Sequence, residues 1–251
     1  MAPDILLETI DLSKSFSGFS AVSNVNLRVK RGSIHALIGP NGAGKTTVFN
    51  LLTKFLPASS GQIRYRGEDI THETPDRTAR RGIVRSFQIS ATFPHLTVLQ
   101  NVRVALQRKR SASFEFWRHE RVLSDLDQRA SELLESVGLA ELRGIRAVEL
   151  PYGRKRALEI ATTLALDPDL MLLDEPTQGM GHEDVGQIVD LIREVSRSRT
   201  ILMVEHNLSV VSRLCDTITV LQRGQILAEG DYAAVSADSR VREAYMGSEA
   251  S

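Results

Sequence analysis

Apolar residues recur along the chain with two different periods, and these periods predict the order of its elements. Strand-like apolar segments cover residues 5–12, 25–30 and 34–38, with the turn-rich stretch SFSGFS between the first two. A hairpin is expected around GQIRYRGEDIT, turning near Arg66 and Gly67. From about residue 97 to 143, apolar residues have the spacing of amphipathic helices. The first part of the chain is therefore expected to be rich in strands and the middle part helical.

After residue 153, helical and strand-like patterns alternate. Helices are expected in 154–166, VGQIVDLIREVSR and LSVVSRLC, and strands in DLMLLD and TILMVEH. The chain ends with a hairpin, TITVLQ-RG-QILAEG, and a short helix. Such alternation is typical of a parallel sheet covered on both faces. We predict one α/β domain over residues 1–251, with a helical lobe inserted at approximately 90–165 and a C-terminal helix at approximately 236–247.

Composition favours a soluble globular protein. Of the 251 residues, 42% are hydrophobic and 25% charged. Lys plus Arg equals Asp plus Glu at 31 each, which argues against bulk electrostatic attraction to nucleic acid or anionic lipid. The longest apolar runs, such as LMLL, are strand-sized, and the N-terminus lacks the pattern of a signal peptide. A single cysteine, Cys215, is expected to pack in a helix, which fits a cytosolic protein.

The stretch GPNGAGKT matches the phosphate-loop pattern G-x-x-x-x-G-K-[ST], and it lies between an apolar strand and a helix. Its glycines allow successive N–H groups to point at phosphate oxygens, and the helix start adds its positive dipole end. Lys45 would reach the β- and γ-phosphates, and the Thr46 hydroxyl would bind Mg²⁺. The alternative, a glycine-rich turn with an exposed lysine, is disfavoured by this context. The residues expected to hold nucleotide here are Gly39, Pro40, Asn41, Gly42, Ala43, Gly44, Lys45, Thr46 and Thr47.

Two acidic residues, Asp174 and Glu175, follow the apolar strand LMLL. Side chains alternate along a strand, so the two carboxylates face different ways and can have different roles. Asp174 would reach Mg²⁺, usually through water, and Glu175 would polarise the water that attacks the γ-phosphate. The alternative is a strand end with solvated acids, which is weak beside a phosphate loop. The sequence therefore predicts binding of a nucleoside triphosphate with Mg²⁺, and its hydrolysis.

The order of these motifs decides between phosphate-loop families. The phosphate loop is followed by the helical segment, then LPYGRKRALEIA, then LLDEP and then MVEH. In this order the chain resembles the ATP-binding cassette of ABC transporters over nearly its whole length. The resemblance implies a RecA-like P-loop NTPase core with an antiparallel β subdomain and an inserted α-helical subdomain.

The resemblance also implies roles for residues outside the phosphate loop. Phe16 would stack on adenine, with Val22 packing nearby; a buried core Phe16 is the alternative, and Phe19 competes for the role. Gln88 in VRSFQ would sense Mg²⁺ and link the two lobes, and the segment after it would meet a membrane subunit. His206 would contact the γ-phosphate and orient the attacking water.

LPYGR falls where the family has its signature motif, commonly LSGGQ, which closes over the ATP of the opposite cassette in a dimer. By this resemblance Pro151, Tyr152, Gly153 and Arg154 contact nucleotide in trans. Three of them depart from the common form, because Pro151 replaces Ser, Tyr152 the first Gly and Arg154 the Gln. Pro151 removes a hydroxyl and an N–H, so we expect weaker contact with nucleotide. Gly181 also stands where an Asp is common.

These departures, together with VRSFQ and MVEHNLSVV, look like the longer ATPase subunit of bacterial branched-chain amino-acid uptake systems. Cassettes for urea uptake and lipopolysaccharide export share the C-terminal pattern. The resemblance implies an ATP-hydrolysing, energy-coupling subunit of an importer for branched-chain amino acids or related small polar solutes. Its expected partners are a second cassette, identical or different, two transmembrane permeases and, indirectly, a periplasmic solute-binding protein. It would lie at the cytoplasmic face of the inner membrane and would not bind nucleic acid.

Two other functions stay open. Soluble ABC ATPases of translation or DNA repair typically carry two cassettes or a long coiled-coil insertion, neither of which is in this sequence. A regulatory module with little hydrolysis is disfavoured by Glu175 and His206, although the weakened signature permits it. The aromatic cluster at 114–121 is expected either to pack the helical lobe or to form a docking surface for a permease helix.

Overall fold

A computed structural model describes residues 4–86, 92–109 and 120–246 of the chain. They fall into two compact units, which are described separately. The first comprises Met1–Ile83, Asp169–Pro176 and Val195–Ser251, and the second comprises Val84–Pro168 and Thr177–Glu194.

The main sheet of the first unit has the strand order β11-β10-β4-β9-β8, and β7 follows at the edge, where the chain passes to the second unit. Strands β10, β4, β9 and β8 are parallel, and β11 is antiparallel to β10. Every residue of β4, β8 and β9 is buried, which explains their uninterrupted apolar sequences. This arrangement confirms the predicted α/β fold class. The strands are β4 (Ile34–Ile38), β7 (Ile83–Ser86), β8 (Leu170–Asp174), β9 (Thr200–Val204), β10 (Thr217–Gln222) and β11 (Gln225–Gly230).

The second sheet of this unit is antiparallel and is built around β1. Strand β1 pairs with β2, β3 and β5, and β6 pairs with β5. The predicted β5–β6 turn is confirmed at Arg66 and Gly67, whose φ angles of 53° and 80° suit a type I′ turn. The strands are β1 (Ile5–Phe16), β2 (Phe19–Val25), β3 (Arg28–Lys30), β5 (Ser60–Tyr65) and β6 (Glu68–Asp69).

Strand β2 differs from the expectation. The segment SFSGFS was expected to separate two strands, but it contains the end of β1, a turn at Ser17 and Gly18, and the start of β2. The strand was not predicted because FSAVSNV contains Ser and Asn, which are common in turns. Pairing with β1 decides its structure.

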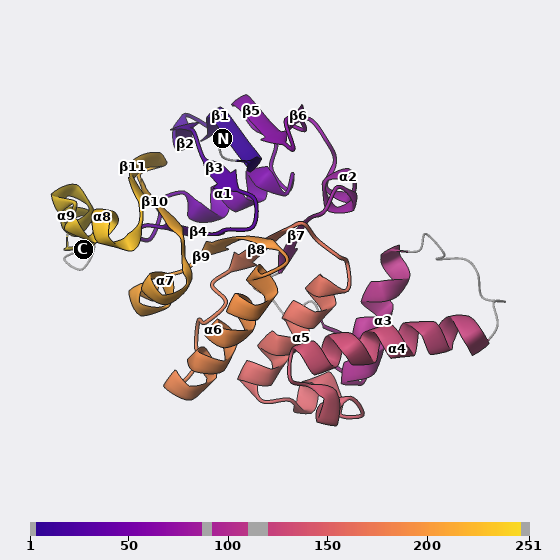
Figure 1. The fold of residues 1–251 in the computed structure, drawn as a ribbon. Helices are drawn as coiled ribbons and strands as arrows, with labels where there is room; N and C mark the ends of the chain where they lie inside the picture. Colours follow the sequence, from indigo (N-terminus) through magenta and orange to yellow (C-terminus); the bar gives the residue numbers. More distant parts are fainter. Residues whose placement is uncertain (1–3, 87–91, 110–119, 247–251) are drawn as a thin grey trace. The chain divides into compact units, whose positions relative to one another are not determined.

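The helices of the first unit cover its sheets. Helix α1 buries Val48, Phe49, Leu51 and Leu52 in a core shared with both sheets. Helices α8 and α9 pack beside β11 (Figure 1). Helix α9 lies within the range expected for the C-terminal helix, approximately 236–247, whereas α8 was not expected; the two are separated at Asp238, which is extended and whose Oδ1 accepts a hydrogen bond from Arg240 N. The helices are α1 (Lys45–Leu52), α2 (Pro75–Arg80), α7 (Leu208–Leu214), α8 (Tyr232–Ala237) and α9 (Ser239–Met246).

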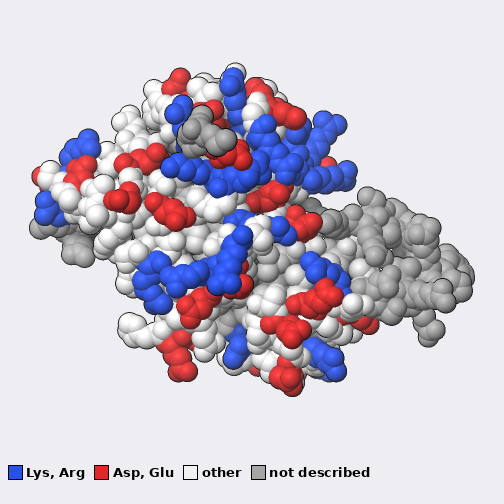
Figure 2. Space-filling model, viewed as in Figure 1, with Lys and Arg blue, Asp and Glu red and all other residues white. Residues whose placement is uncertain are grey.

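Opposite charges are interspersed in the first unit. Arg81 forms ion pairs with Glu68 and Glu73, and Arg28 with Glu8. Figure 2 shows Lys and Arg side chains gathered over the region of β5, β6 and α2, with Asp and Glu among them. These pairs fit the balanced formal charge of the whole sequence.

The second unit is helical, and α3, α4 and α5 contact one another. Buried Asn101 holds the loop before α3, because its Oδ1 accepts from Phe93 N at 2.6 Å and its Nδ2 donates to Thr97 O at 2.9 Å. The helices are α3 (Val98–Lys109), α4 (Glu120–Ser136), α5 (Tyr152–Leu164) and α6 (His182–Ser196), with 3₁₀ turns at Ala140–Leu142 and Ala147–Glu149. Helix α6 belongs to this unit up to Glu194.

The side chains of the aromatic cluster at 114–121 lie outside the described residues. Among the helices that the structure describes, none is long and apolar enough to cross a bilayer.

Candidate nucleotide site and signature segment

The predicted phosphate loop connects β4 to α1 in the first unit. Lys45 is only 6% exposed, and its Nζ donates to the carbonyls of Gly39 at 2.7 Å and Pro40 at 3.0 Å. An ammonium group has three hydrogens, and these bonds use two of them. Burial lowers the pKa of Lys45, and the charges of Glu175 and Asp174 act in the opposite direction. The side chain is thus placed within its own loop, close to two carboxylates.

Two glycines of this loop are required by neighbouring backbone. A β-carbon at Gly39 would lie 2.1 Å from Leu221 O, and one at Gly44 would lie 2.7 Å from Ala21 O. The turn between β10 and β11 supports the same loop, since Gly224 N donates to Ala43 O at 2.9 Å and Gly224 O accepts from Ser23 N at 2.8 Å. The loop conformation therefore depends on β2 and on the C-terminal hairpin. Sequence reasoning missed Gly224, because nothing local links it to the phosphate loop.

The residues of the phosphate loop differ in exposure, and some of them face solvent, where a phosphate could reach them. The structure buries Gly39, Ala43 and Lys45, partly buries Pro40, Gly44 and Thr47, and exposes Asn41, Gly42 and Thr46. The exposed Thr46 hydroxyl and the Asp174 carboxylate at the end of β8 are oxygen donors of the kind that Mg²⁺ prefers, so the residues present fit this ion. Gln88, the third expected metal residue, lies outside the described residues. The described ranges contain no group of three or more His, Cys, Asp or Glu suited to a metal, and Mg²⁺ bound through phosphates and water needs few protein ligands.

Glu175 and His206 are brought together across β8 and β9. Glu175 Oε1 and His206 Nε2 are 3.0 Å apart, with side-chain exposures of 15% and 41%. The other carboxylate oxygen, Oε2, is buried and has no hydrogen-bond partner among the described residues. Glu175 also has a positive φ of 46°, while its N–H still bonds Val204 O at 2.9 Å. Oε2 is therefore the carboxylate oxygen that is left to accept a further hydrogen bond.

A second glutamate fixes the position of His206. Glu205 is buried, and its Oε2 accepts from the backbone N–H groups of His206 at 3.0 Å and Asn207 at 3.1 Å. Asn207 then caps α7, because its Oδ1 accepts from Ser209 N and Val210 N. Sequence reasoning missed Glu205, although Asn before the helical segment LSVV is an N-cap signal that marks the turn.

The aromatic residues expected at adenine lie at the end of the β1–β2 hairpin. Phe16 and Phe19 are paired across the two strands and are 43% and 68% exposed. The reading of Phe16 as a core residue is therefore wrong. The Lys14 ammonium lies 5.1 Å from the centroid of the Phe16 ring. Val22, expected nearby, is fully buried in β2, and its Cγ2 would lie 3.5 Å from a β-carbon at Gly44.

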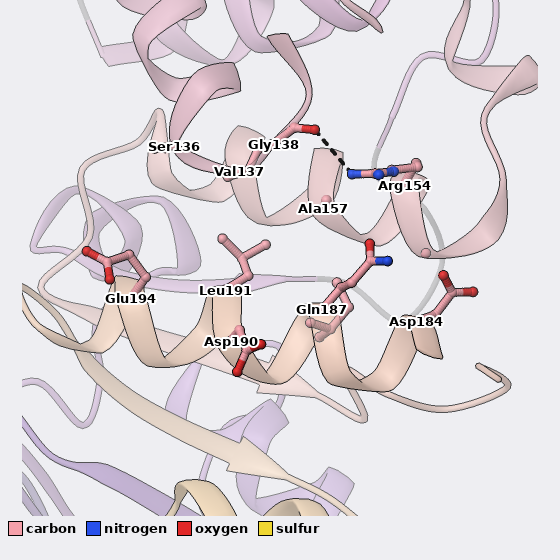
Figure 3. A pocket seen from close by; sticks show the side chains of 12 residues that line it. Ser136, Val137, Gly138, Arg154, Ala157, Asp184, Gln187, Asp190, Leu191 and Glu194 are labelled. Carbon is pink, nitrogen blue, oxygen red and sulfur yellow. Dashed lines mark hydrogen bonds between the residues drawn. The ribbon is translucent and has the colours of Figure 1, made fainter. Parts of the chain in front are cut away.

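The expected signature segment begins α5 in the second unit. Pro151 is the extended N-cap residue, and Tyr152 starts the helix and is 57% exposed. Gly153 is buried, and Arg154 Nη1 donates to Gly138 O at 3.2 Å (Figure 3). Two of the four residues are thus exposed, and the other two contact their own unit. Gly181, the other departure, is exposed just before α6.

Cys215 follows α7 at its C-cap rather than lying inside the helix. Burial raises the pKa of its thiol to about 12, and the charges of Asp216 and Glu205 act in the same direction. A thiol is a weaker nucleophile than a thiolate, which fits the expected packing role of this residue.

Comparison with known proteins identifies the family. The family described as "ABC transporter" matches residues 22–178. The chain belongs to the ABC transporter family. A further family, "Branched-chain amino acid ATP-binding cassette transporter", matches residues 225–251 of this cassette.

The cassette has similar relatives over almost its full length. It is 36% identical to the high-affinity branched-chain amino acid transport ATP-binding protein BraF of Pseudomonas aeruginosa, covering 96% of this chain and 98% of that protein. It is also 36% identical to LivG of Escherichia coli K12, which has the same description, again covering 96% and 98%.

Solved structures show the same fold. An ATP-binding cassette of an ABC transporter in its ADP conformation superposes with a TM-score of 0.85 at 30% identity, covering 97% of this chain and 99% of that chain. A dimeric bacterial ABC transporter cassette shares the fold with a TM-score of 0.76 at 23% identity, covering 90% and 99%. Family membership therefore explains the order of motifs that the sequence displayed.

Proposed function

We propose that this cassette is the ATP-hydrolysing, energy-coupling subunit of an ABC importer for branched-chain amino acids or related small polar solutes. The observation that carries hydrolysis is the Glu175–His206 pair, in which Glu175 Oε2 is buried and has no partner in the described part of the chain. The observation that favours this solute class is full-length similarity to two branched-chain amino acid transport ATP-binding proteins. The reaction is conversion of ATP and water to ADP and phosphate.

The first unit holds the nucleotide. Lys45 binds the β- and γ-phosphates with the hydrogen that its two loop bonds leave, and backbone N–H groups of the loop line the phosphates, apart from Pro40, which has none, and Ala43, whose N–H bonds Pro40 O. The exposed face of Phe16 stacks on adenine, with Val22 beneath the hairpin. Thr46, Asp174 and Gln88 hold Mg²⁺, which when bound offsets the negative charge of the phosphates.

Glu175 and His206 act on the attacking water. A carboxylate accepts hydrogen bonds only, so the 3.0 Å contact makes His206 Nε2 the donor to Oε1. Oε2 is then the oxygen that accepts from the water and takes its proton as the water oxygen bonds to the γ-phosphorus, while the bond from that phosphorus to the bridging oxygen breaks and ADP leaves. His206, held by Glu205 through its backbone, keeps the carboxylate oriented and reaches the γ-phosphate.

A second cassette completes the site. Residues Pro151, Tyr152, Gly153 and Arg154 contact the ATP of that cassette in trans, and the dimeric relative of the same fold supports such an assembly. Residues 1–251 form one nucleotide-binding domain with a helical subdomain at approximately 90–165, and the segment that follows Gln88 meets a permease. Two permeases and, indirectly, a periplasmic solute-binding protein complete the importer at the cytoplasmic face of the inner membrane.

Deletion of this chain in its host tests the proposal. Uptake of labelled leucine, isoleucine and valine should be lost, and should return with the wild-type chain but not with Glu175→Gln. Loss of urea uptake alone would favour the urea-importer alternative, and a defect in lipopolysaccharide export alone would favour the exporter. Normal uptake of all solutes with impaired translation or DNA repair would refute a transport role.

A further inference from the structure

Gly153, at the start of α5, is in contact with Asp184, in the first turn of α6. A β-carbon built on Gly153 would lie 2.8 Å from both Cγ and Oδ1 of Asp184 and 3.2 Å from its Cβ. The whole Asp184 side chain therefore lies against the backbone of Gly153, in space that any other residue would fill. This contact lies within the second unit.

The contact suits the start of α5 electrically as well as sterically. The N-cap residue is Pro151, which has no side chain that accepts a hydrogen bond from the first turn. A carboxylate near a helix N-terminus is stabilised by the positive end of the helix dipole. Asp184 thus supplies negative charge where the cap residue cannot, and it does so from a neighbouring helix.

Two further contacts hold the same turn. Tyr152 lies against Gly179, where a β-carbon would be 3.9 Å from the Tyr152 ring, and Arg154 donates to Gly138 O at 3.2 Å. Between α4, α5 and α6 is a pocket of about 320 Å³, which Arg154 and Asp184 both line (Figure 3). The start of α5 thus borders this pocket, and it contacts two neighbours there, the segment after α4 through Arg154 and α6 through Asp184.

We propose that Asp184 is a positioning residue for the signature segment: it holds the N-terminus of α5 against α6, and so sets the direction in which Tyr152 and Gly153 point. The inference rests on the proposed function, in which this segment reaches the ATP of a second cassette. Asp184 lies in the helix that follows Glu175 and the segment 176–181 along the chain. A contact between Gly153 and this helix therefore joins the signature segment to the part of the chain that follows the catalytic glutamate.

The first experiment compares Asp184→Ala with Asp184→Asn in the full chain, in the complex isolated from its host. Asp184→Ala removes the contact and should lower kcat for ATP hydrolysis roughly ten- to a hundredfold, as expected for a misplaced reacting group. Its ATP affinity, measured on the dilute chain, should stay within about twofold of wild type, because the chain binds that nucleotide through its own phosphate loop. Asp184→Asn keeps the shape and should retain kcat within about threefold.

Asp190→Ala is the matched control. Asp190 is exposed on α6 and lines the same pocket, but it lies against no glycine of α5. It should have the wild-type kcat. Wild-type kcat in Asp184→Ala would overturn the proposal. An equal loss in Asp184→Asn and Asp184→Ala would support it, with the charge of the carboxylate at the start of α5 contributing more than its shape.

A rescue experiment tests the pair directly. Gly153→Ala places a methyl group against the Asp184 carboxylate and should lower kcat, and Gly153→Ala with Asp184→Gly should recover at least part of that loss because the obstruction is gone. Gly186→Ala, on α6 with open space around it, controls for the change of glycine to alanine. Strictly additive losses in the double variant would contradict the proposed contact.

The two proposals fail in different ways. A wild-type complex that neither binds nor hydrolyses ATP would refute the proposed function. A wild-type complex that hydrolyses ATP and loses this activity with Glu175→Gln, while Asp184→Ala has no effect, would refute only the role of Asp184.

Discussion

Glu175 Oε1 lies 3.0 Å from His206 Nε2, while Glu175 Oε2 is buried without a partner among the described residues. The two oxygens of one carboxylate therefore have different environments. One is held by a histidine and the other is left to accept a further hydrogen bond. This difference is what a base needs if it is to be oriented and still reactive.

Glu175→Gln should nearly abolish hydrolysis while ATP still binds. His206 Nε2 donates to position 175, so it selects the amide oxygen of glutamine and turns the amide NH₂ toward the place of the water. An amide there cannot take a proton, and turnover should fall by roughly 10²–10⁴-fold. Phosphate release and ATP titration measure the two effects. Glu243→Gln, exposed in α9, is the control, and unchanged turnover in Glu175→Gln would exclude Glu175 as the base.

Glu205 should be needed for the position of His206. Glu205→Ala removes the acceptor of two backbone N–H groups and should cost about 1–3 kcal/mol of unfolding free energy, with a fall in kcat. Glu205→Gln keeps an acceptor oxygen and should lose less of both. Urea unfolding and steady-state ATPase assays check this. If Glu205→Ala had the wild-type kcat while His206→Ala had no measurable ATPase activity, His206 would not need Glu205 to hold its position.

Local sequence patterns predicted the parts of the site that are contiguous in the chain. The phosphate loop, the acids Asp174 and Glu175 at the end of β8 and, outside the site, the Arg66–Gly67 turn each combine residue types with a spacing that few other structures tolerate. Their neighbours in sequence are also their neighbours in space. Such elements need no knowledge of the tertiary structure.

The parts that escaped prediction depend on distant residues. Strand β2 forms because β1 pairs with it, and Gly224 matters because Ala21 and Ala43 lie beside it. Asp184 was missed for the same reason, since its significance lies in the missing β-carbon of Gly153. A single sequence does not show which surface residues meet.

Restoring a common signature should change activity without changing how the chain binds its own nucleotide. Pro151→Ser returns a hydroxyl and an N–H to the segment, and it is tested alone before it is combined with Arg154→Gln, because the second change also removes the bond to Gly138 O that holds this turn. One added hydrogen bond of about 0.5–1.5 kcal/mol corresponds to a rise in turnover of roughly two- to tenfold in the assembled transporter. ATP affinity of the dilute chain should not move. A change in that affinity would contradict contact in trans.

Gly224→Ala should weaken ATP binding through the phosphate loop. A β-carbon at Gly224 would lie 2.6 Å from Ala21 O, so the turn must move away from Ala43, which it supports. Gly67→Ala is the matched control. Gly67 has a φ of 80°, close to the 78° of Gly224, but a β-carbon at Gly67 would have no atom within 4 Å. Both should lose about 1–2 kcal/mol of stability, because alanine disfavours this conformation. Only Gly224→Ala should also lose affinity, about tenfold for a further 1.4 kcal/mol. Equal ATP titrations for the two variants would argue against this coupling.

The buried residue His35 should make the first unit sensitive to acid. Its Nε2 lies 2.8 Å from Thr219 Oγ1, and Thr219 donates its only hydroxyl hydrogen to Glu229 Oε2 at 2.7 Å, so His35 must be the donor. Burial, with the charge of Lys30, lowers the pKa of His35 from 6.5 to about 4. Between pH 6.5 and about 4, His35 is therefore protonated in the unfolded chain but neutral in the folded chain. The free energy of unfolding falls as the pH drops through this range.

The size of the effect follows from the difference between the two pKa values, at about 1.4 kcal/mol for each pH unit, which gives a total of about 3 kcal/mol. His35→Gln keeps an N–H donor for Thr219 but does not titrate, so urea unfolding across this range should show a shallower loss of stability. His72→Gln, exposed in the same unit, should keep the wild-type slope. An identical slope in His35→Gln and wild type would mean that other groups set the acid sensitivity, and that His35 is protonated in the folded protein as readily as in the unfolded chain.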